Sequence, residues 1–169
     1  MKKTLLTVIV TTLAAVAAHS QNYMVVNTES IFKSLPAYTK AVEEIDAAAQ
    51  QYQTNIDNAY EQLEEMYQTY MSQRESLSQS ARQQREHTIL NNEERIAAYQ
   101  EEAFGDEGEI MKMQQQKLEP YRQKVMTAIT EYAKANGYSL VLDIATNPLV
   151  IYYDPSTDKT EQIIATLKK

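Results

Sequence analysis

The chain has no cysteine, and its 169 residues include only three glycines, four prolines and two histidines. Without cysteine there is no disulfide, no thiol nucleophile and no Cys-ligated metal. Only His87 follows the N-terminal segment, so one chain cannot supply a pair of histidines to a metal. The scarcity of glycine and proline, with a middle region rich in Ala, Gln, Glu and Tyr, is typical of long helices.

Residues 1–20 have the features of a secretory signal peptide. Lys2 and Lys3 precede an apolar run from Leu5 to Ala18, and small residues lead up to Ser20. The run is shorter than the roughly 20 apolar residues that a membrane span needs. We therefore expect export, cleavage near Ser20 and no stable membrane insertion. Loss of the two lysines moves the formal net charge from −7 to −9, which argues against nucleic acid as a partner.

The middle of the chain carries two interleaved apolar series, each repeating every seven residues. Such a pattern predicts a coiled coil whose contact line, here called the seam, is formed by both series. The outgoing series are Val42, Ala49, Ile56, Leu63, Tyr70, Leu77 and Tyr38, Ile45, Tyr52, Ala59, Met66. The returning series are Ile89, Ile96, Ala103, Ile110 and Asn92, Tyr99, Asp106, Met113.

A short polar segment separates the two stretches and predicts that the coil folds back on itself. Residues 76–82 are rich in serine, which favours a turn. An antiparallel hairpin folded about a point near Gln79 places Leu63 opposite Ile96 and Ile56 opposite Ala103. Each arm then runs about 39 residues, or roughly 58 Å.

The ends of the chain predict short strands and helices. Strands are expected at Tyr23–Val26, Leu140–Leu142 and Leu149–Tyr153. Asn27 or Thr28 is expected to cap a brief helix, and Asp158 with Glu161 to form a capping box before the last one. The strands are apolar throughout, which favours burial on both faces, yet three short strands cannot bury themselves in one chain. We therefore expect them to pool into an oligomer core.

These observations predict an α+β fold that is mostly α. A long antiparallel coiled-coil hairpin, residues 38–118 with its tip near 76–82, is expected to project from a small β body. The body comprises residues 21–37 and 119–169 and is completed by oligomerisation. The candidate oligomer-core residues are Val25, Val26, Leu140, Val141, Leu142 and Val150.

Two acidic features are considered as a catalytic acid–base pair and as a calcium-binding loop, and the residue pattern argues against both. Neighbouring acids such as Glu64 and Glu65 diverge by about 100° on a helix, so they solvate its surface rather than form an acid–base pair. Residues 104–109 lack the alternating ligand order of a calcium-binding loop. We expect a protein that is not an enzyme and that uses no metal or other cofactor.

Several segments resemble the Skp/OmpH family of periplasmic chaperones. They are VVNTESIFKSLPAY at residues 25–38, ANGYSLVLD at 135–143, IYYD at 151–154 and TEQII at 160–164. The resemblance implies a homotrimer with a shared β-barrel body and three helical tentacles around a cavity. It further implies that unfolded outer-membrane proteins are held there in the periplasm without nucleotide. The best-known members are basic, whereas this chain is acidic, with a pI near 4.9.

A holdase, meaning a chaperone that holds unfolded chains without refolding them, needs exposed and adaptable apolar side chains. Candidates beside the seam are Tyr60, Tyr67, Met71, Phe104 and Met111. The alternative is that these residues broaden the seam. Gly105 and Gly108 are candidate hinge residues, because glycine weakens a helix by about 1 kcal/mol relative to alanine. A structural coiled-coil spacer or scaffold is the competing function, although a rigid spacer favours a stronger seam.

Overall fold

The structure is a computed structural model that describes residues 22–146 and 149–168. The expected signal peptide, residues 1–20, therefore lies outside the described residues. The chain divides into two compact units. One unit, here called the hairpin, comprises Ala37–Tyr121; the other, called the body, comprises the residues before and after it. These divisions lie close to the expected boundaries at 37/38 and 118/119.

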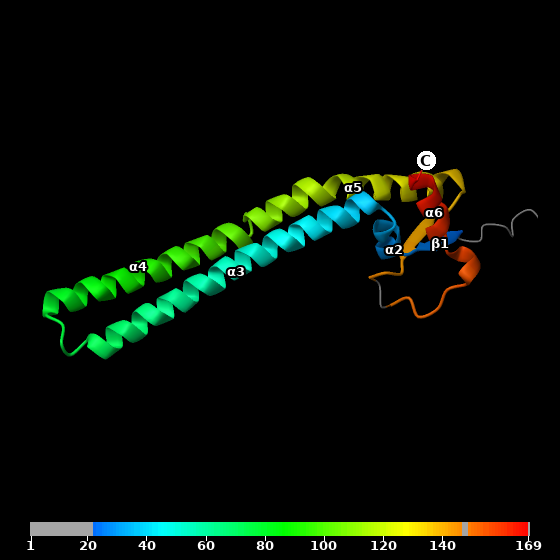
Figure 1. Cartoon of the computed structure of the whole chain (residues 1–169). Helices are drawn as coiled ribbons and strands as arrows, with labels where there is room; N and C mark the ends of the chain where they lie inside the picture. Colours follow the sequence, from blue (N-terminus) through cyan, green and yellow to red (C-terminus); the bar gives the residue numbers. More distant parts are fainter. Residues whose placement is uncertain (1–21, 147–148, 169) are drawn as a thin grey trace, which may run out of the picture. The chain divides into compact units, whose positions relative to one another are not determined.

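The hairpin consists of helices that run antiparallel and side by side (Figure 1). The outgoing arm is α3, Pro36–Gln73, which is 38 residues or about 57 Å long. Pro36 stands at its first position, where a helix tolerates the missing N–H. The return arm comprises α4, Gln79–Phe104, and the first part of α5, Glu109–Ala135. The mostly helical hairpin predicted from the heptad pattern is confirmed.

The seam is buried where the heptad pattern placed its largest aliphatic residues. Buried side chains along it include Ile45, Ile56, Ile96 and Ile110. Near the base, Ala41, Ile45, Ile110 and Leu118 form one cluster, against which Tyr38 and Tyr121 also pack. The two tyrosine rings meet edge to face with their centroids 6.1 Å apart.

Two details of the hairpin differ from the expectation. The connection between the arms covers residues 74–78, so the tip lies before most of the expected range of 76–82. The reason is Ser78, which caps α4 by accepting a hydrogen bond from the Ala81 N–H, so residues 79–82 are already helical. Asp106, expected in the seam, is exposed, and the ring of Tyr52 lies against the rings of Tyr99 and Phe104.

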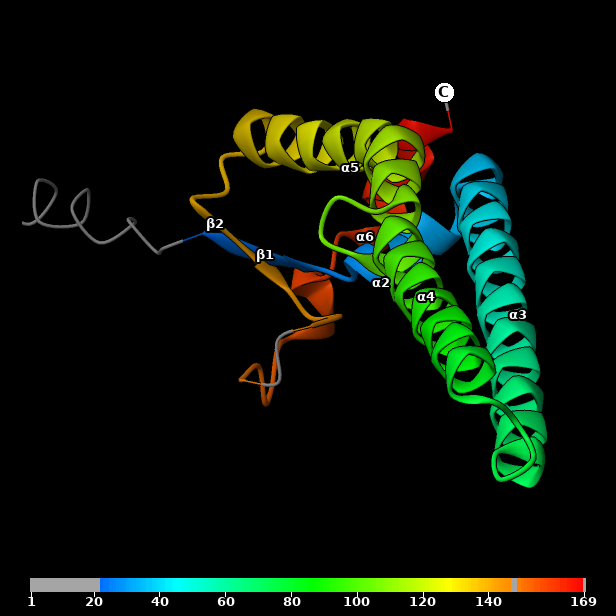
Figure 2. The same ribbon diagram turned by 90° about the vertical axis from the view of Figure 1, so that its left-hand side faces the viewer.

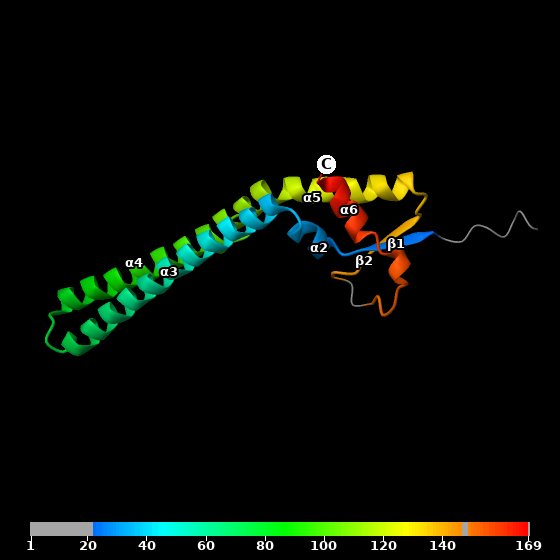
Figure 3. The same ribbon diagram turned by 45° about the vertical axis from the view of Figure 1, so that its right-hand side comes forward.

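The body contains a two-stranded parallel sheet, in which β1, Tyr23–Val26, lies beside β2, Leu140–Asp143 (Figure 3). The register pairs Tyr23 with Leu140 and Val26 with Asp143. α2, Thr28–Lys33, follows β1 and is capped by Asn27, whose side chain accepts from the Ser30 N–H. The short helix η1, Pro155–Thr157, precedes α6, Thr160–Leu167, which packs against α2.

The expected third strand at Leu149–Tyr153 is wrong for the single chain. Residues 150–154 have no regular structure, and the nearest pairing is an isolated bridge between Val25 and Asp158. Residues 150–153 have strand-forming side chains, but neither strand of the described sheet pairs with them. The expected capping box is also wrong: Asp158 accepts from the Thr160 N–H, and Lys159 is the N-cap residue.

Most of the buried side chains of the body come from β1, α2, α5 and α6. Met24, Val25, Val26, Ile31, Val125 and Ile163 are almost fully buried. Thr160, the buried polar residue among them, accepts a hydrogen bond of 2.8 Å from the Asn27 N–H. Among the described residues, no helix is long and apolar enough to cross a membrane.

Candidate functional site

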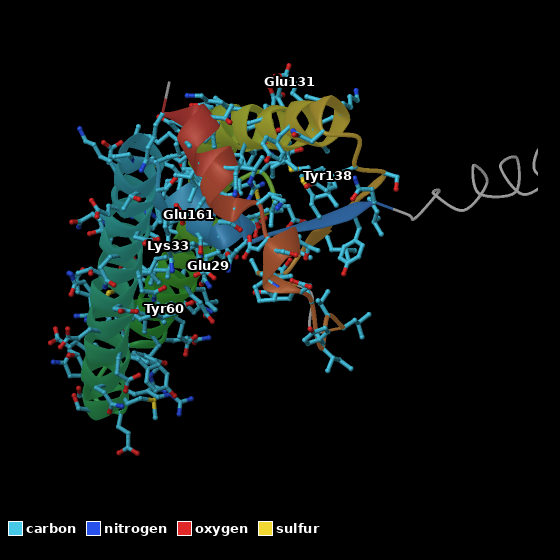
Figure 4. All side chains as sticks on the ribbon, turned by 90° about the vertical axis from the view of Figure 1, so that its right-hand side faces the viewer. Glu29, Lys33, Tyr60, Glu131, Tyr138 and Glu161 are labelled. Carbon is cyan, nitrogen blue, oxygen red and sulfur yellow. The ribbon has the colours of Figure 1, made fainter. Side chains whose placement is uncertain are left out.

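The five residues proposed for client contact are all exposed on the hairpin. Tyr60, Tyr67 and Met71 lie on α3, and Tyr60 is visible at the surface of that helix in Figure 4. Phe104 is the last residue of α4, and Met111 lies in the first turn of α5. Leu90 on α4 joins this set, although it was not proposed from the sequence. We call these six residues the stripe; each is between 40% and 56% exposed.

Leu90 was missed although its position carried a signal. It follows the seam residue Ile89 by one position, as Phe104 follows Ala103 and Met111 follows Ile110. The alternative that these residues broaden the seam holds in part for Phe104, whose ring meets that of Tyr52 edge-on with centroids 6.3 Å apart. The other stripe residues have no aromatic partner within the described part of the chain.

The stripe occupies one face of the hairpin, as helix geometry requires. Its residues follow a seam residue by one or four positions, which corresponds to a rotation of about 100° or 40° from the seam. In an antiparallel pair, the same rotation on both helices leads to the same face. Tyr60 and Tyr67 on α3 and Leu90 on α4 are therefore on one side of the seam.

The opposite face carries a groove rather than a stripe. Its volume is about 650 Å³, and its lining includes residues that precede a seam residue by one position: Asn55, Gln62, Arg95 and Glu102. Leu63 and Ile96 also line it, in agreement with the expected pairing of these two residues. The Asn55 amide donates a hydrogen bond of 3.1 Å to the Tyr99 hydroxyl across the groove. None of the stripe residues borders it.

The return arm is interrupted at the proposed hinge residues. α4 ends at Phe104 and α5 begins at Glu109, and the link between them is visible as a loop (Figure 2). Gly105 caps α4 in an extended conformation and donates its N–H to the Glu101 carbonyl, while Gly108 donates to the Gly105 carbonyl. A Cβ on Gly108 would lie 2.8 Å from the Ala103 carbonyl oxygen. Glycine is therefore required by the close approach of backbone atoms here.

Near the tip, the arms are tied together by polar contacts. The Tyr70 hydroxyl donates a hydrogen bond to the Glu86 carboxylate across the hairpin. This hydrogen bond raises the pKa of Tyr70, and desolvation acts in the same direction. At the base, Lys117 on α5 donates to Glu44 on α3, and this hydrogen bond lowers the pKa of Glu44. Both contacts join residues of the two arms.

The candidate oligomer-core residues fall into two groups. Val25 and Val26 are already buried inside the body of a single chain. Leu140 is half exposed, and Val141, Leu142 and Val150 are partly exposed. Beside Val150, the side chains of Leu149, Ile151 and Tyr152 are 83% to 95% exposed. Apolar side chains of the body thus remain uncovered mainly in the segment from 149 to 152.

Comparisons with known proteins agree with this architecture. A crystal structure of a protein from Caulobacter crescentus CB15, described as an outer membrane chaperone (OmpH-like), has a similar fold with a TM-score of 0.61. The two sequences are 16% identical, and the similarity covers 89% of this chain and 86% of the other. The comparison with curated protein sequences found no match. The family model described as outer membrane protein (OmpH-like) matches residues 22–167. Because this match spans most of the 169 residues, the chain belongs to the OmpH-like outer membrane protein family.

Proposed function

We propose that this protein is an ATP-independent holdase that binds unfolded outer-membrane or other envelope proteins in the periplasm and prevents their aggregation. The observation that carries the proposal is the stripe. Tyrosine, methionine and phenylalanine side chains stand 40% to 46% exposed on both arms of a helical hairpin, and of these only Phe104 packs its ring against an aromatic neighbour within the described residues. Isolated exposed apolar residues are ordinary, but a series along one face favours contact with other chains.

The chemistry of the stripe suits many partners. Methionine is flexible and polarizable, and tyrosine combines an apolar ring with a polar end. Such side chains repack around different sequences, as surfaces of promiscuous binding proteins do. Each contact contributes little, so binding depends on several contacts along α3 and α4 and stays reversible. The description of the Caulobacter protein as a chaperone supports the same role.

We also propose that the protein acts as a homotrimer. The described sheet has two strands, whereas a sheet that is stable by itself needs three or more. The strand-forming segment from 149 to 152 is exposed in the single chain. Pairing of this segment with another copy would bury the exposed side chains of Ile151 and Tyr152. The resemblance noted from the sequence supports three copies around a common barrel.

The spacer function is less well supported than the holdase function. A rigid spacer requires continuous helices, but the return arm is interrupted between Phe104 and Glu109. A spacer function also does not explain why aromatic side chains are exposed on the arms. We propose instead that the Gly105–Gly108 link is a hinge that lets the hairpin adapt to clients of different size.

The test is an aggregation assay without nucleotide. A β-barrel membrane protein unfolded in urea is diluted into buffer with or without the purified mature protein, and light scattering is followed. We expect the parent protein to suppress scattering. A variant with Tyr60→Gln, Tyr67→Gln and Met71→Gln should lose most of this activity. The matched control Asn58→Ala, Gln62→Ala and Thr69→Ala changes three exposed residues on the other flank of α3 and should retain it.

Two results would contradict the proposal. One is that the parent protein fails to reduce scattering at several-fold molar excess. The other is that the stripe variant protects the client as well as the control variant does. Circular dichroism on all three proteins checks that helicity is unchanged, since only exposed positions are altered.

A further inference from the structure

The excess negative charge of this protein resides entirely in the hairpin. Residues 37–121 contain 17 Asp and Glu residues and seven Lys and Arg residues, a formal net charge of −10. The whole chain has a net charge of −7, so the remaining residues carry +3. The unit that presents the stripe is therefore the acidic one.

Carboxylates surround the stripe. Residues three or four positions apart on a helix are surface neighbours, with Cβ atoms about 5–6 Å apart. On α3 and α4, the acidic residues at these distances from a stripe residue are Asp57, Glu64, Glu86, Glu93, Glu94 and Glu101. No Lys or Arg on these two helices occupies such a position. Arg74 follows the stripe residue Met71 by three positions but lies just beyond the end of α3.

The acids beside the stripe have only neutral partners or none. Asp57 accepts a hydrogen bond from Gln53, Glu64 accepts one from Gln68, and Glu86 accepts one from Tyr70. Among the residues that the structure describes, the carboxylates in ion pairs within 4.0 Å are Glu29, Glu44 and Glu109. The negative charge next to the stripe is thus not neutralised within the chain.

Four of the seven basic residues of the hairpin line grooves that no stripe residue borders. Arg95 lines the main groove, and Arg85 lines a second groove nearer the tip. Lys40 and Lys117 line a third at the base. The stripe residues border none of these grooves. The face that carries the stripe therefore combines apolar side chains with carboxylates, and most basic side chains of the hairpin lie elsewhere.

We propose that the stripe selects unfolded polypeptide segments in which Lys or Arg alternates with apolar or aromatic side chains. This inference rests on the proposed function and names the class of segment that the same surface binds. The apolar side chains of the segment pack on Tyr60, Tyr67 and Leu90. Its cations lie within reach of Glu64 and Glu93, at distances shorter than the roughly 8 Å screening length at physiological salt. Acidic segments are repelled by the same carboxylates.

The experiment uses three unfolded, dye-labelled peptides with the same apolar residues at the same positions. Their polar positions carry Lys, Gln or Glu. Fluorescence anisotropy measures their binding to the full mature protein at low and high salt. We expect the Lys peptide to bind about tenfold more tightly than the Gln peptide at low salt, because several exposed ion pairs each add a small contribution. The Glu peptide should bind most weakly, and high salt should bring the three affinities together.

A pair of matched variants locates the effect. Glu64→Gln with Glu93→Gln removes two carboxylates beside the stripe and should reduce the preference for the Lys peptide several-fold. Glu65→Gln with Glu102→Gln removes two groove-lining carboxylates, one from each helix, and should leave most of the preference in place. Both variants make the same change in net charge, so a difference between them depends on position.

The outcomes separate this inference from the proposed function. If all three peptides bind equally well, or if the two variants behave alike, selection by the stripe carboxylates is wrong while the holdase function stands. If none of the peptides binds and the urea-diluted client also aggregates freely, the proposed function itself fails. Tightest binding of the Glu peptide would overturn the inference outright.

Discussion

At the scale of single residues, Asp143 connects the sheet to the helix that follows β1. It ends β2 and accepts hydrogen bonds from the Thr28 N–H at 3.1 Å, the Thr28 hydroxyl at 2.5 Å and the Ala145 N–H at 3.0 Å. Burial alone would raise its pKa, but these hydrogen bonds outweigh burial and lower the pKa below the ordinary value of 3.8. The sequence identified Asn27 and Thr28 as helix-start residues but gave no sign of this partner 115 positions away.

The lowered pKa of Asp143 predicts a pH-dependent loss of stability. A carboxyl group with a depressed folded pKa stabilises the fold above its unfolded pKa, and this contribution is lost as pH falls through the folded pKa. Asp143→Asn should therefore lower the free energy of unfolding by about 1–2 kcal/mol at pH 7. The difference from the parent should shrink as the pH is taken below 3.8, as measured by urea unfolding. Asp46→Asn, an exposed carboxylate on α3, is the control and should change little.

At the scale of elements, the helices were predictable and the connections were not. Heptad spacing is a repeated signal over many residues, so it located α3 and the return arm. The turn depended on a few residues, and the serine-rich run concealed a helix cap at Ser78. The aromatic and methionine residues of the stripe were predicted from the sequence, but Leu90 was not. Strand propensity misled at Leu149–Tyr153, because pairing depends on a neighbour that the sequence does not specify.

The hairpin register predicts which engineered cysteines join. The chain has no cysteine of its own, so Leu63→Cys with Ile96→Cys creates one possible intrachain disulfide. Both residues line the same groove, and we expect them to crosslink under mild oxidation, as measured by a mobility shift without reductant. Leu63→Cys with Ile89→Cys, shifted by one heptad, should not crosslink within the chain. Equal crosslinking of both pairs would show that the register is wrong.

The interruption at Gly105–Gly108 predicts an effect on the range of clients. Alanine does not fit the link, since a Cβ on Gly105 would lie 2.5 Å from the Glu101 carbonyl oxygen. Gly105→Ala with Gly108→Ala should favour a continuous helix, by up to about 1 kcal/mol per residue, and increase the helical circular dichroism signal. Large barrel clients should be protected less well, and small ones as before. Gln100→Ala with Gln114→Ala, which raises helix propensity outside the link, is the control. Unchanged protection of all clients would rule out a hinge.

At the scale of the whole molecule, the proposed homotrimer requires the body of one chain to associate with those of other copies. The sequence predicted that its short strands need partners, and the single chain leaves the segment from 149 to 152 exposed. The number of copies is not encoded in any periodic pattern of the sequence. Val25 and Val26, which the sequence placed among the oligomer-core candidates, are already buried within one chain.

Association predicts a specific effect of a charge in the exposed segment. Sedimentation equilibrium of the mature protein at micromolar concentration should give a trimer. Ile151→Asp should weaken association by at least tenfold, because it places a charge in a contact that must lose its water. Leu90→Asp, on the hairpin, should leave association unchanged. A well-folded parent monomer at this concentration would contradict the pooled-core argument.

The central claim, that the stripe holds unfolded chains, is tested most directly by photo-crosslinking. A benzophenone amino acid is placed at Tyr67 in one variant and at Gln62 in another; both positions are exposed on α3 and about 140° apart around the helix. Each variant is mixed with a urea-diluted β-barrel protein without nucleotide and irradiated. We predict strong crosslinks to the client from position 67 and weak ones from position 62. Equal crosslinking from both positions, or none from position 67, would contradict the account.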